Sequence, residues 1–373
     1  MGSKWQAEPA ICRPALLSAG VAPSRRGLVI AGLLGVLAGT LGTPAEGRSG
    51  VRYAADPGSV SPLAHTFSIV ARDSVTGDIG VAVQSHYFAV GPIVPWAEPG
   101  VGAVATQSLV EVAYGPRGLA LMRAGKSPGE ALAELVAADS GRAGRQVAMI
   151  DTLGRVAAYT GPRCIPAAGN LVGEQFSVQA NLMANPRIWP AMAEGYRRAG
   201  GDLADRLLQA LEAGQAAGGD IRGQQSAAIV IVRGRASDRP WADKILDLRV
   251  EDHPHPITEL RRLVTLWRAY RFVDAGDAAV TANDMVAAAR NYGEAGHLAP
   301  NNMEIVFWQA VGLFTVGREK EALPLFRKVF AREYRWVELV PRLGPVGLLP
   351  NDPAKTKLIL AQAPKAPDRK PRL

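Results

Sequence analysis

The sequence predicts a layered α/β body from Thr66 to about Val250, followed by a smaller all-helical part. Three observations carry this prediction. Short apolar segments come in pairs separated by turn residues, which is typical of β-hairpins and therefore of antiparallel sheets. Amphipathic stretches lie between these pairs, and such helices need a sheet face to cover. From Pro256 onward the apolar residues recur at helical spacing, as at Ile257 and Leu260.

The individual elements follow from the same patterns. The first hairpin joins a strand that begins at Thr66 to a strand over Ile79–Val83, across turn-forming residues. Ser127 is the expected N-cap of a helix, because serine oxygens accept hydrogen bonds from first-turn N–H groups. The remaining predictions are strands over 101–106, 146–150, 155–159, 176–181, 226–232 and 245–250, and helices over 115–123, 128–138, 186–198 and 203–213.

An export signal is predicted at the N-terminus. Arg25 and Arg26 precede an apolar run from Leu28 to Leu41, and small residues follow up to Ala45. This three-part pattern is typical of export, and the paired arginines favour the twin-arginine pathway. The apolar run is shorter than the ~20 residues that a membrane-spanning helix needs. We therefore expect residues 1–45 to be a removed signal, 46–65 a linker or propeptide, and the mature protein to be periplasmic or secreted without a transmembrane span.

Composition argues against several functional classes. The formal net charge is +8, but part of it lies in the leader and part in a basic tail over 353–373, and no nucleic-acid-binding motif accompanies it. Of the two cysteines, Cys12 lies in the leader, which leaves Cys164 without an internal disulfide partner. The five histidines show no metal-ligand spacing, and no glycine-rich phosphate loop is present. We expect no nucleic acid, metal or cofactor.

Several segments resemble one family closely. The stretches TFSIVARD, GVAVQS, VPWA, GAVATQS, YGP, FSVQAN and GQAAGGD, all between residues 66 and 220, resemble the family known as domain of unknown function 1028. The resemblance extends over residues 66–253. It implies membership of the N-terminal-nucleophile (Ntn) hydrolase superfamily, and hence an αββα sandwich of antiparallel sheets. Some members carry a C-terminal segment labelled peptidoglycan-binding, whose start resembles Asp252-His253-Pro254.

The helical part, over 254–352, carries a weak repeat. Ala288, Tyr292, Ala295 and Pro300 fall at offsets of the second half of a tetratricopeptide repeat, and a shortened version follows. An ordinary helical hairpin is an equal alternative.

The resemblance also implies a catalytic site. In Ntn enzymes the first residue of the mature chain is the nucleophile, and its own α-amine is the base. The resemblance therefore implies that Thr66 is the nucleophile once the bond between His65 and Thr66 has been cut. Candidate partners are the pair Gln84 and Ser85, which stands where proteasome-type β subunits carry Asp-Ser, and Gln107, Ser108 and Asn181 as oxyanion donors. His86, Asp220 and Arg222 are candidate substrate-binding residues. A lysine partner is missing from the strands after Thr66, since Lys126 follows the first helix.

Two functions therefore stay open. The chain is either an exported amidohydrolase that cleaves a small amide or peptide-like bond, or a catalytically silent Ntn-fold protein whose helical part binds a protein partner or the cell wall. The sequence leaves a homodimer open.

Overall fold

The computed structural model describes residues 63–365. The predicted export signal, residues 46–62 of the predicted linker and the last residues of the basic tail lie outside the described part of the chain. The α/β character, the antiparallel sheets and the helical C-terminal region are confirmed.

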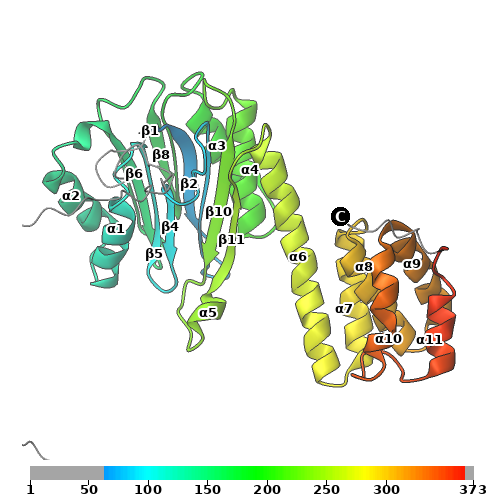
Figure 1. The fold of residues 1–373 in the computed structure, drawn as a ribbon. Helices are drawn as coiled ribbons and strands as arrows, with labels where there is room; N and C mark the ends of the chain where they lie inside the picture. The colour runs from blue at the N-terminus through cyan, green and yellow to red at the C-terminus, as the bar shows by residue number, and fades with distance from the viewer. Residues whose placement is uncertain (1–62, 366–373) are drawn as a thin grey trace, which may run out of the picture. The chain divides into compact units, whose positions relative to one another are not determined.

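Two antiparallel sheets form the centre of the α/β body (Figure 1). The six-stranded sheet has the order β11-β10-β3-β2-β9-β8, and the five-stranded sheet has the order β1-β5-β6-β7, with β4 also paired to β5. The bounds of the first sheet are β2 Thr66–Arg72, β3 Ile79–Ser85, β8 Gly169–Gly173, β9 Phe176–Ala180, β10 Ser226–Val232 and β11 Lys244–Val250. Those of the second are β1 Leu63–Ala64, β4 Pro95–Glu98, β5 Gly102–Leu109, β6 Arg145–Asp151 and β7 Val156–Thr160.

Helices cover the outer face of each sheet, so the body has four layers. Helices α1 (Tyr114–Arg123) and α2 (Pro128–Ala138) pack on the five-stranded sheet through residues such as Leu119 and Met149. Helices α3 (Ile188–Arg198) and α4 (Leu203–Ala216) pack on the six-stranded sheet, in the core that contains Phe67 and Leu207. A separate apolar core fills the space between the sheets.

Strand alternation decides which residues reach which core. Phe67 and Ile69 of β2 face the helices α3 and α4, whereas Val70 faces the other sheet. Helix α4 lies so close to β3 that a Cβ atom on Gly80 would stand 2.6 Å from the side chain of Leu207. A side chain at position 80 would have to push the end of the Leu207 side chain aside, and glycine avoids this. At the start of α2, Ser127 and Glu130 form the reciprocal capping box, which confirms the predicted N-cap.

The C-terminal region consists of helices, as predicted. Ile257, Leu260 and Val264, in the first half of the long helix α6, pack into the core of the six-stranded sheet. Tyr292 and its neighbours form a smaller core with the second half of α6. The helices are α6 Pro256–Thr281, α7 Met285–Leu298, α8 Met303–Thr315, α9 Glu319–Arg332, α10 Val340–Leu343 and α11 Pro353–Leu360. These contacts are those of packed helical hairpins, and the repeat assignment stays a prediction.

Several short elements were not predicted. Strands β1, β4 and β8, the short helix α5 (Pro240–Asp243) and the 3-10 turns Arg142–Gly144 and Tyr334–Glu338 are additions. Strand β1 is the most informative, because it shows that the end of the expected linker pairs with the sheet. Within residues 63–365, no helix has the length and apolar character needed to cross a membrane.

Candidate functional site

Thr66 is the first residue of β2 and is fully buried between the two sheets. The chain that precedes it runs along β5, where Leu63 pairs with Leu109 and Ala64 with Ser108. The hydroxyl of Thr66 donates to the carbonyl oxygen of Ala64 at 2.7 Å and lies 3.2 Å from Ser85 Oγ. Ser85 is the cross-strand partner of Thr66 on β3. The two hydroxyls are therefore neighbours because the hairpin register sets them opposite each other.

The carbonyl oxygen of His65 receives two side-chain donors. Ser85 Oγ donates to it at 2.7 Å, and Arg222 Nη2 donates to it at 2.7 Å. Asp220 fixes the guanidinium, because its carboxylate accepts from Arg222 Nε at 3.0 Å and from Nη2 at 2.7 Å. The side chain of Asp220 is fully buried. A charge-assisted donor and a hydroxyl thus converge on the oxygen of the peptide bond that precedes Thr66.

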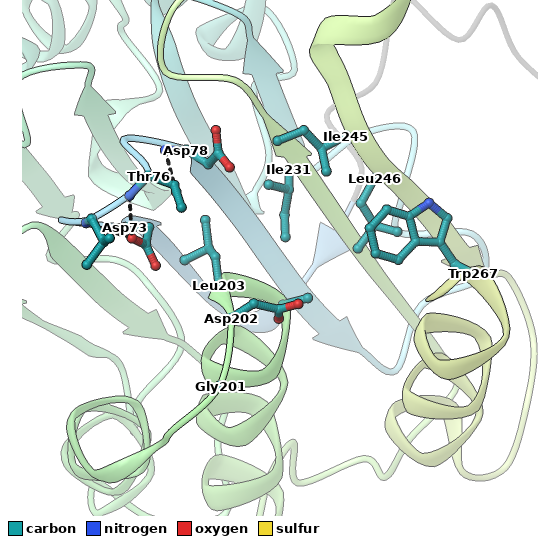
Figure 2. A pocket seen from close by; sticks show the side chains of 12 residues that line it. Asp73, Thr76, Asp78, Gly201, Asp202, Leu203, Ile231, Ile245, Leu246 and Trp267 are labelled. Carbon is teal, nitrogen blue, oxygen red and sulfur yellow. Dashed lines mark hydrogen bonds between the residues drawn. The ribbon is translucent and has the colours of Figure 1, made fainter. Parts of the chain in front are cut away.

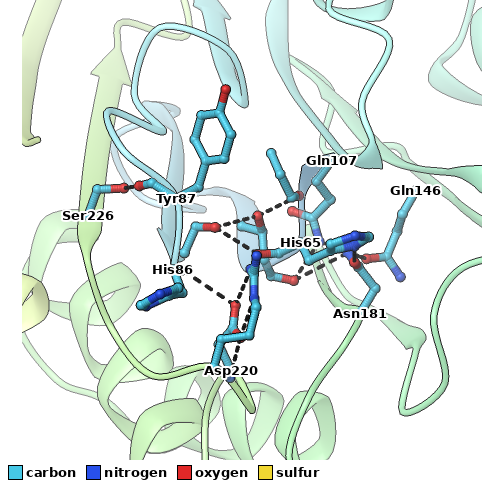
Figure 3. Close-up of polar contacts among 12 residues, drawn as sticks. His65, His86, Tyr87, Gln107, Gln146, Asn181, Asp220 and Ser226 are labelled. Atoms are coloured by element: carbon cyan, nitrogen blue, oxygen red, sulfur yellow. Dashed lines mark hydrogen bonds and ion pairs between the residues drawn. The ribbon is translucent and has the colours of Figure 1, made fainter. Parts of the chain in front are cut away.

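A network of side-chain amides holds the other side of this bond (Figure 3). Gln146 Oε1 accepts from Gln107 Nε2 at 2.7 Å and from Asn181 Nδ2 at 2.9 Å. Because the Asn181 nitrogen is used in this way, its oxygen faces His65 Nδ1 at 2.8 Å. Gln107 Nε2 also donates to the carbonyl oxygen of Thr66 at 3.2 Å. The amides therefore hold the His65 side chain and the carbonyl oxygen of Thr66 without using a charged group.

His65 is held neutral by its surroundings. Burial lowers the pKa of its imidazole, the nearby Arg222 lowers it further, and the hydrogen bond to Asn181 and the charge of Asp220 oppose this only in part. With Nδ1 donating to Asn181, the other ring nitrogen carries a lone pair. The ring can therefore accept a proton.

The structure brings together most of the predicted site residues. Ser85, Gln107 and Asn181 contact Thr66 directly, and Arg222 and Asp220 join them through His65. Arg222 donates to the backbone of the chain itself, and its predicted role in binding a substrate stays a prediction. Lys126 pairs with Glu134 at the surface and takes no part in this network.

The side chains of three predicted residues make no hydrogen bond with Thr66. Gln84 and Ser85 are consecutive in a strand, so their side chains point to opposite faces, and only Ser85 shares the face of Thr66. The buried amide of Gln84 has no hydrogen-bond partner within the described residues. Ser108 has a φ of 77° on β5 and pairs through its backbone with Ala64. The ring of His86 makes no hydrogen bond with Thr66, although its backbone N–H lies 3.4 Å from Asp220 Oδ2.

A separate cavity of about 340 Å³ lies at the far end of β2 (Figure 2). Its apolar lining comes from Leu203, Ile231, Ile245, Leu246 and Trp267, with Asp73 and Asp78 at the turn after β2. At ~3.3 Å per strand residue, the length of β2 separates this cavity from Thr66 by roughly 20 Å. It is therefore distinct from the site at His65 and Thr66. In the described part of the chain, no cluster of three His, Cys, Asp or Glu residues is arranged to hold a metal ion.

Comparison with known proteins places the chain in a family. A model described as a family of unknown function (DUF1028) matches residues 66–260. The chain belongs to the DUF1028 family. A crystal structure of a DUF1028 protein from Silicibacter pomeroyi is similar to it, with 33% identity, 54% of this chain and 84% of that chain covered, and a TM-score of 0.49. A search of curated proteins finds no match.

The DUF1028 match contains most of the site. It begins at Thr66 and includes Ser85, Asn181 and Arg222, whereas His65 stands one residue before it. Sequence reasoning missed His65 and Gln146 as parts of the network. The signal for Gln146 is a glutamine at the start of the buried apolar strand β6, where an unpaired amide would cost free energy. His65 lies in a segment that the sequence pattern assigned to a linker.

Proposed function

We propose that this DUF1028 protein is an exported Ntn-type amidohydrolase that exposes its own nucleophile by cutting the bond between His65 and Thr66. The observation that carries the proposal is the pair of donors on the His65 carbonyl oxygen, Ser85 Oγ at 2.7 Å and Arg222 Nη2 at 2.7 Å. Donors in these positions stabilise the negative charge that develops on a carbonyl oxygen under attack.

The proposed cut is an acyl shift followed by hydrolysis. The hydroxyl oxygen of Thr66 attacks the carbonyl carbon of His65, and the bond from that carbon to the Thr66 nitrogen breaks. The hydroxyl proton passes to the departing nitrogen, and Ser85 Oγ, which lies 3.2 Å from the Thr66 hydroxyl, is the candidate carrier. Water then hydrolyses the resulting ester. The products are a carboxylate on His65 and a chain whose first residue is Thr66.

The freed residue has the parts that amide hydrolysis requires. Its α-amine can take the proton of its own hydroxyl, which a threonine hydroxyl needs in order to attack at neutral pH. Ser85 and Arg222 would then hold the oxygen of the substrate carbonyl, and Arg222 supplies a cation where the sequence has no lysine. The reaction is the hydrolysis of a small amide or peptide-like bond, without metal or cofactor.

The test compares Thr66 variants of the full chain. The purified protein is incubated at pH 7.5, and both the cut after His65 and the later hydrolysis of a panel of peptide amides are followed by mass spectrometry. Thr66→Ala is expected to abolish both reactions, and Thr66→Ser to retain them. Thr76→Ala, at the exposed turn after β2, serves as the matched control. Equal hydrolysis by wild type and Thr66→Ala would show that Thr66 is not the nucleophile, and a wild type that never cuts or hydrolyses favours the silent binding protein.

A further inference from the structure

Residues 63–65, which precede Thr66, lie in the site in the extended, strand-paired form that a bound peptide substrate would take. Leu63 and Ala64 pair antiparallel with Leu109 and Ser108 of β5, along the same strand that β4 pairs with further on. Ala64 and His65 are almost completely buried, whereas Leu63 is 54% exposed. Main-chain pairing with a sheet edge is how many proteins bind an extended peptide.

We propose that the place filled by Leu63–His65 is the acyl-side substrate site of the mature enzyme, and that its substrates are extended peptides. The inference rests on the proposed function and names its substrate class. A substrate carries a small residue in the place of Ala64 and, in the place of His65, a side chain with an N–H donor. The bond that is cut follows this second residue.

The backbone of β5 is the first source of recognition. When the segment before Thr66 leaves, the main-chain groups of Ser108 and Leu109 that face β1 lose their partner. An unpaired strand edge offers N–H and C=O groups to any incoming extended chain. A peptide that pairs here is guided toward Thr66 in the direction and register of the departed segment.

Side-chain recognition follows from what surrounds the segment. Ala64 belongs to the apolar core between the sheets, where it contributes a single methyl group, so a larger residue in its place would clash with well-packed neighbours. The side chain in the place of His65 is recognised by Asn181, whose oxygen accepts a hydrogen bond from His65 Nδ1 at 2.8 Å. Gln146 holds the Asn181 amide in this orientation, so an acceptor is presented to the substrate. The place of Leu63 is exposed, so it should accept many different substrate residues.

The released segment should itself bind the mature enzyme. After the cut, His65 ends in a carboxylate, and the guanidinium of Arg222 that held its carbonyl oxygen then faces an anion. Arginine binds carboxylates more strongly than it binds neutral carbonyl groups. The departed segment is therefore the first product inhibitor of the enzyme.

The experiment uses a trimmed chain, in which a cleavable fusion partner replaces residues 1–65 and is removed so that the chain begins at Thr66. The site is then open whether or not the full chain cuts itself. The probe is a synthetic peptide of residues 59–65 with a free C-terminal carboxylate, and its binding is measured by calorimetry. We expect saturable binding that is about tenfold weaker for the His65→Ala peptide, as expected for the loss of one buried hydrogen bond. The Ala64→Phe peptide should not bind detectably, and the Leu63→Ala peptide should bind almost as well as the parent.

A double-mutant cycle gives the sharper result. In the trimmed chain carrying Asn181→Ala, the parent and His65→Ala peptides should bind equally, because the acceptor is gone. Absence of peptide binding to the trimmed chain, or an equal His65→Ala effect with and without Asn181, overturns the inference. Failure of the full chain to cut itself, with peptide binding intact, would instead count against the proposed function.

Discussion

At the scale of single residues, two side-chain donors of the site converge on one carbonyl oxygen, that of His65. Arg222 reaches this oxygen only because the buried carboxylate of Asp220 orients its guanidinium, so the pair acts as one unit. Ser85 completes the arrangement from the neighbouring strand. Removing Arg222 altogether would leave Asp220 buried without its partner, which costs several kcal/mol in folded proteins.

Arg222→Lys tests this unit while keeping the positive charge. A single ammonium cannot reproduce the planar fork that bonds both Asp220 and the His65 oxygen. We expect the cut between His65 and Thr66 to slow by about 100-fold, a magnitude typical of the loss of one oxyanion donor. The rate is measured by mass spectrometry after purification of the uncut chain. Arg187→Lys, at an exposed position, should cut at the wild-type rate; equal rates for both variants would exclude the assigned role of Arg222.

The lowered pKa of His65 predicts a pH dependence of stability. Because the folded chain favours the neutral ring and the unfolded chain titrates near 6.5, the unfolded state binds more protons below that pH. The contribution of the neutral His65 ring to the unfolding free energy is therefore fully present above about pH 6.5. It is lost as the pH falls toward the lowered pKa of the folded state. Urea unfolding of the uncut Thr66→Ala chain should show a lower unfolding free energy at pH 5 than at pH 7.5. Adding His65→Gln to this chain should remove the part of the decrease that His65 causes. A pH profile that His65→Gln leaves unchanged would contradict the assignment.

Much of the site was predictable at this scale, because the family resemblance points to these positions and their residue types suit the chemistry. Thr66, Ser85, Gln107, Asn181 and Arg222 were singled out from the sequence, and the structure brings them together. Gln84 was not separable from Ser85 within a family motif, although strand alternation divides them between two faces. His65 was missed because its partners, Asn181 and Arg222, lie more than a hundred residues away in the sequence.

At the scale of elements, the long strands and helices followed from their patterns and the short strands did not. Strand β4 begins with Pro95, and β8 begins and ends with glycine, so neither shows the alternation of a half-buried strand. Strand β1 has two residues and exists only because β5 offers a partner. Such elements depend on tertiary contacts, which local sequence patterns do not encode.

Ala64→Phe tests whether the seating of β1 is needed for the cut. The buried methyl group of Ala64 leaves no room for a phenyl ring in the core between the sheets, so the segment before Thr66 should be displaced. We expect at least a tenfold slower cut in the full chain, measured as for Arg222→Lys. Leu63→Phe, at the exposed neighbouring position, is the matched control and should cut normally. An unimpaired Ala64→Phe chain would show that β1 does not position the bond.

At the scale of the whole molecule, the site draws all its described contacts from the α/β body. Helix α6 links this body to the helical region, since its first half packs in the core of the six-stranded sheet. Arg268 adds ion pairs with Asp202 at 2.7 Å and Asp205 at 2.8 Å, at the start of α4. Exposed pairs of this kind contribute at most about 1 kcal/mol each, so apolar packing is the stronger attachment.

Two truncations separate the roles of α6 and of the helices after it. A chain that ends at Arg268 keeps Ile257, Leu260 and Val264 and should fold and cut at nearly the wild-type rate. A chain that ends at Val250 exposes the surface these residues cover and should lose about 5–9 kcal/mol of unfolding free energy, at 1.5–3 kcal/mol for each of the three buried aliphatic side chains. Urea unfolding and mass spectrometry measure both outcomes. Loss of the cut in a chain that ends at Arg268 but is as stable as the wild type would place part of the site in the helical region.

The central claim is that the folded chain cuts itself between His65 and Thr66 and so frees a nucleophile. N-terminal sequencing together with intact-mass analysis of the full-length chain, produced with its export signal and collected after export, tests this claim most directly. The account predicts a mature chain that begins at Thr66 in the wild type and a chain that begins upstream of His65 in Thr66→Ala. An upstream terminus in both proteins would contradict it.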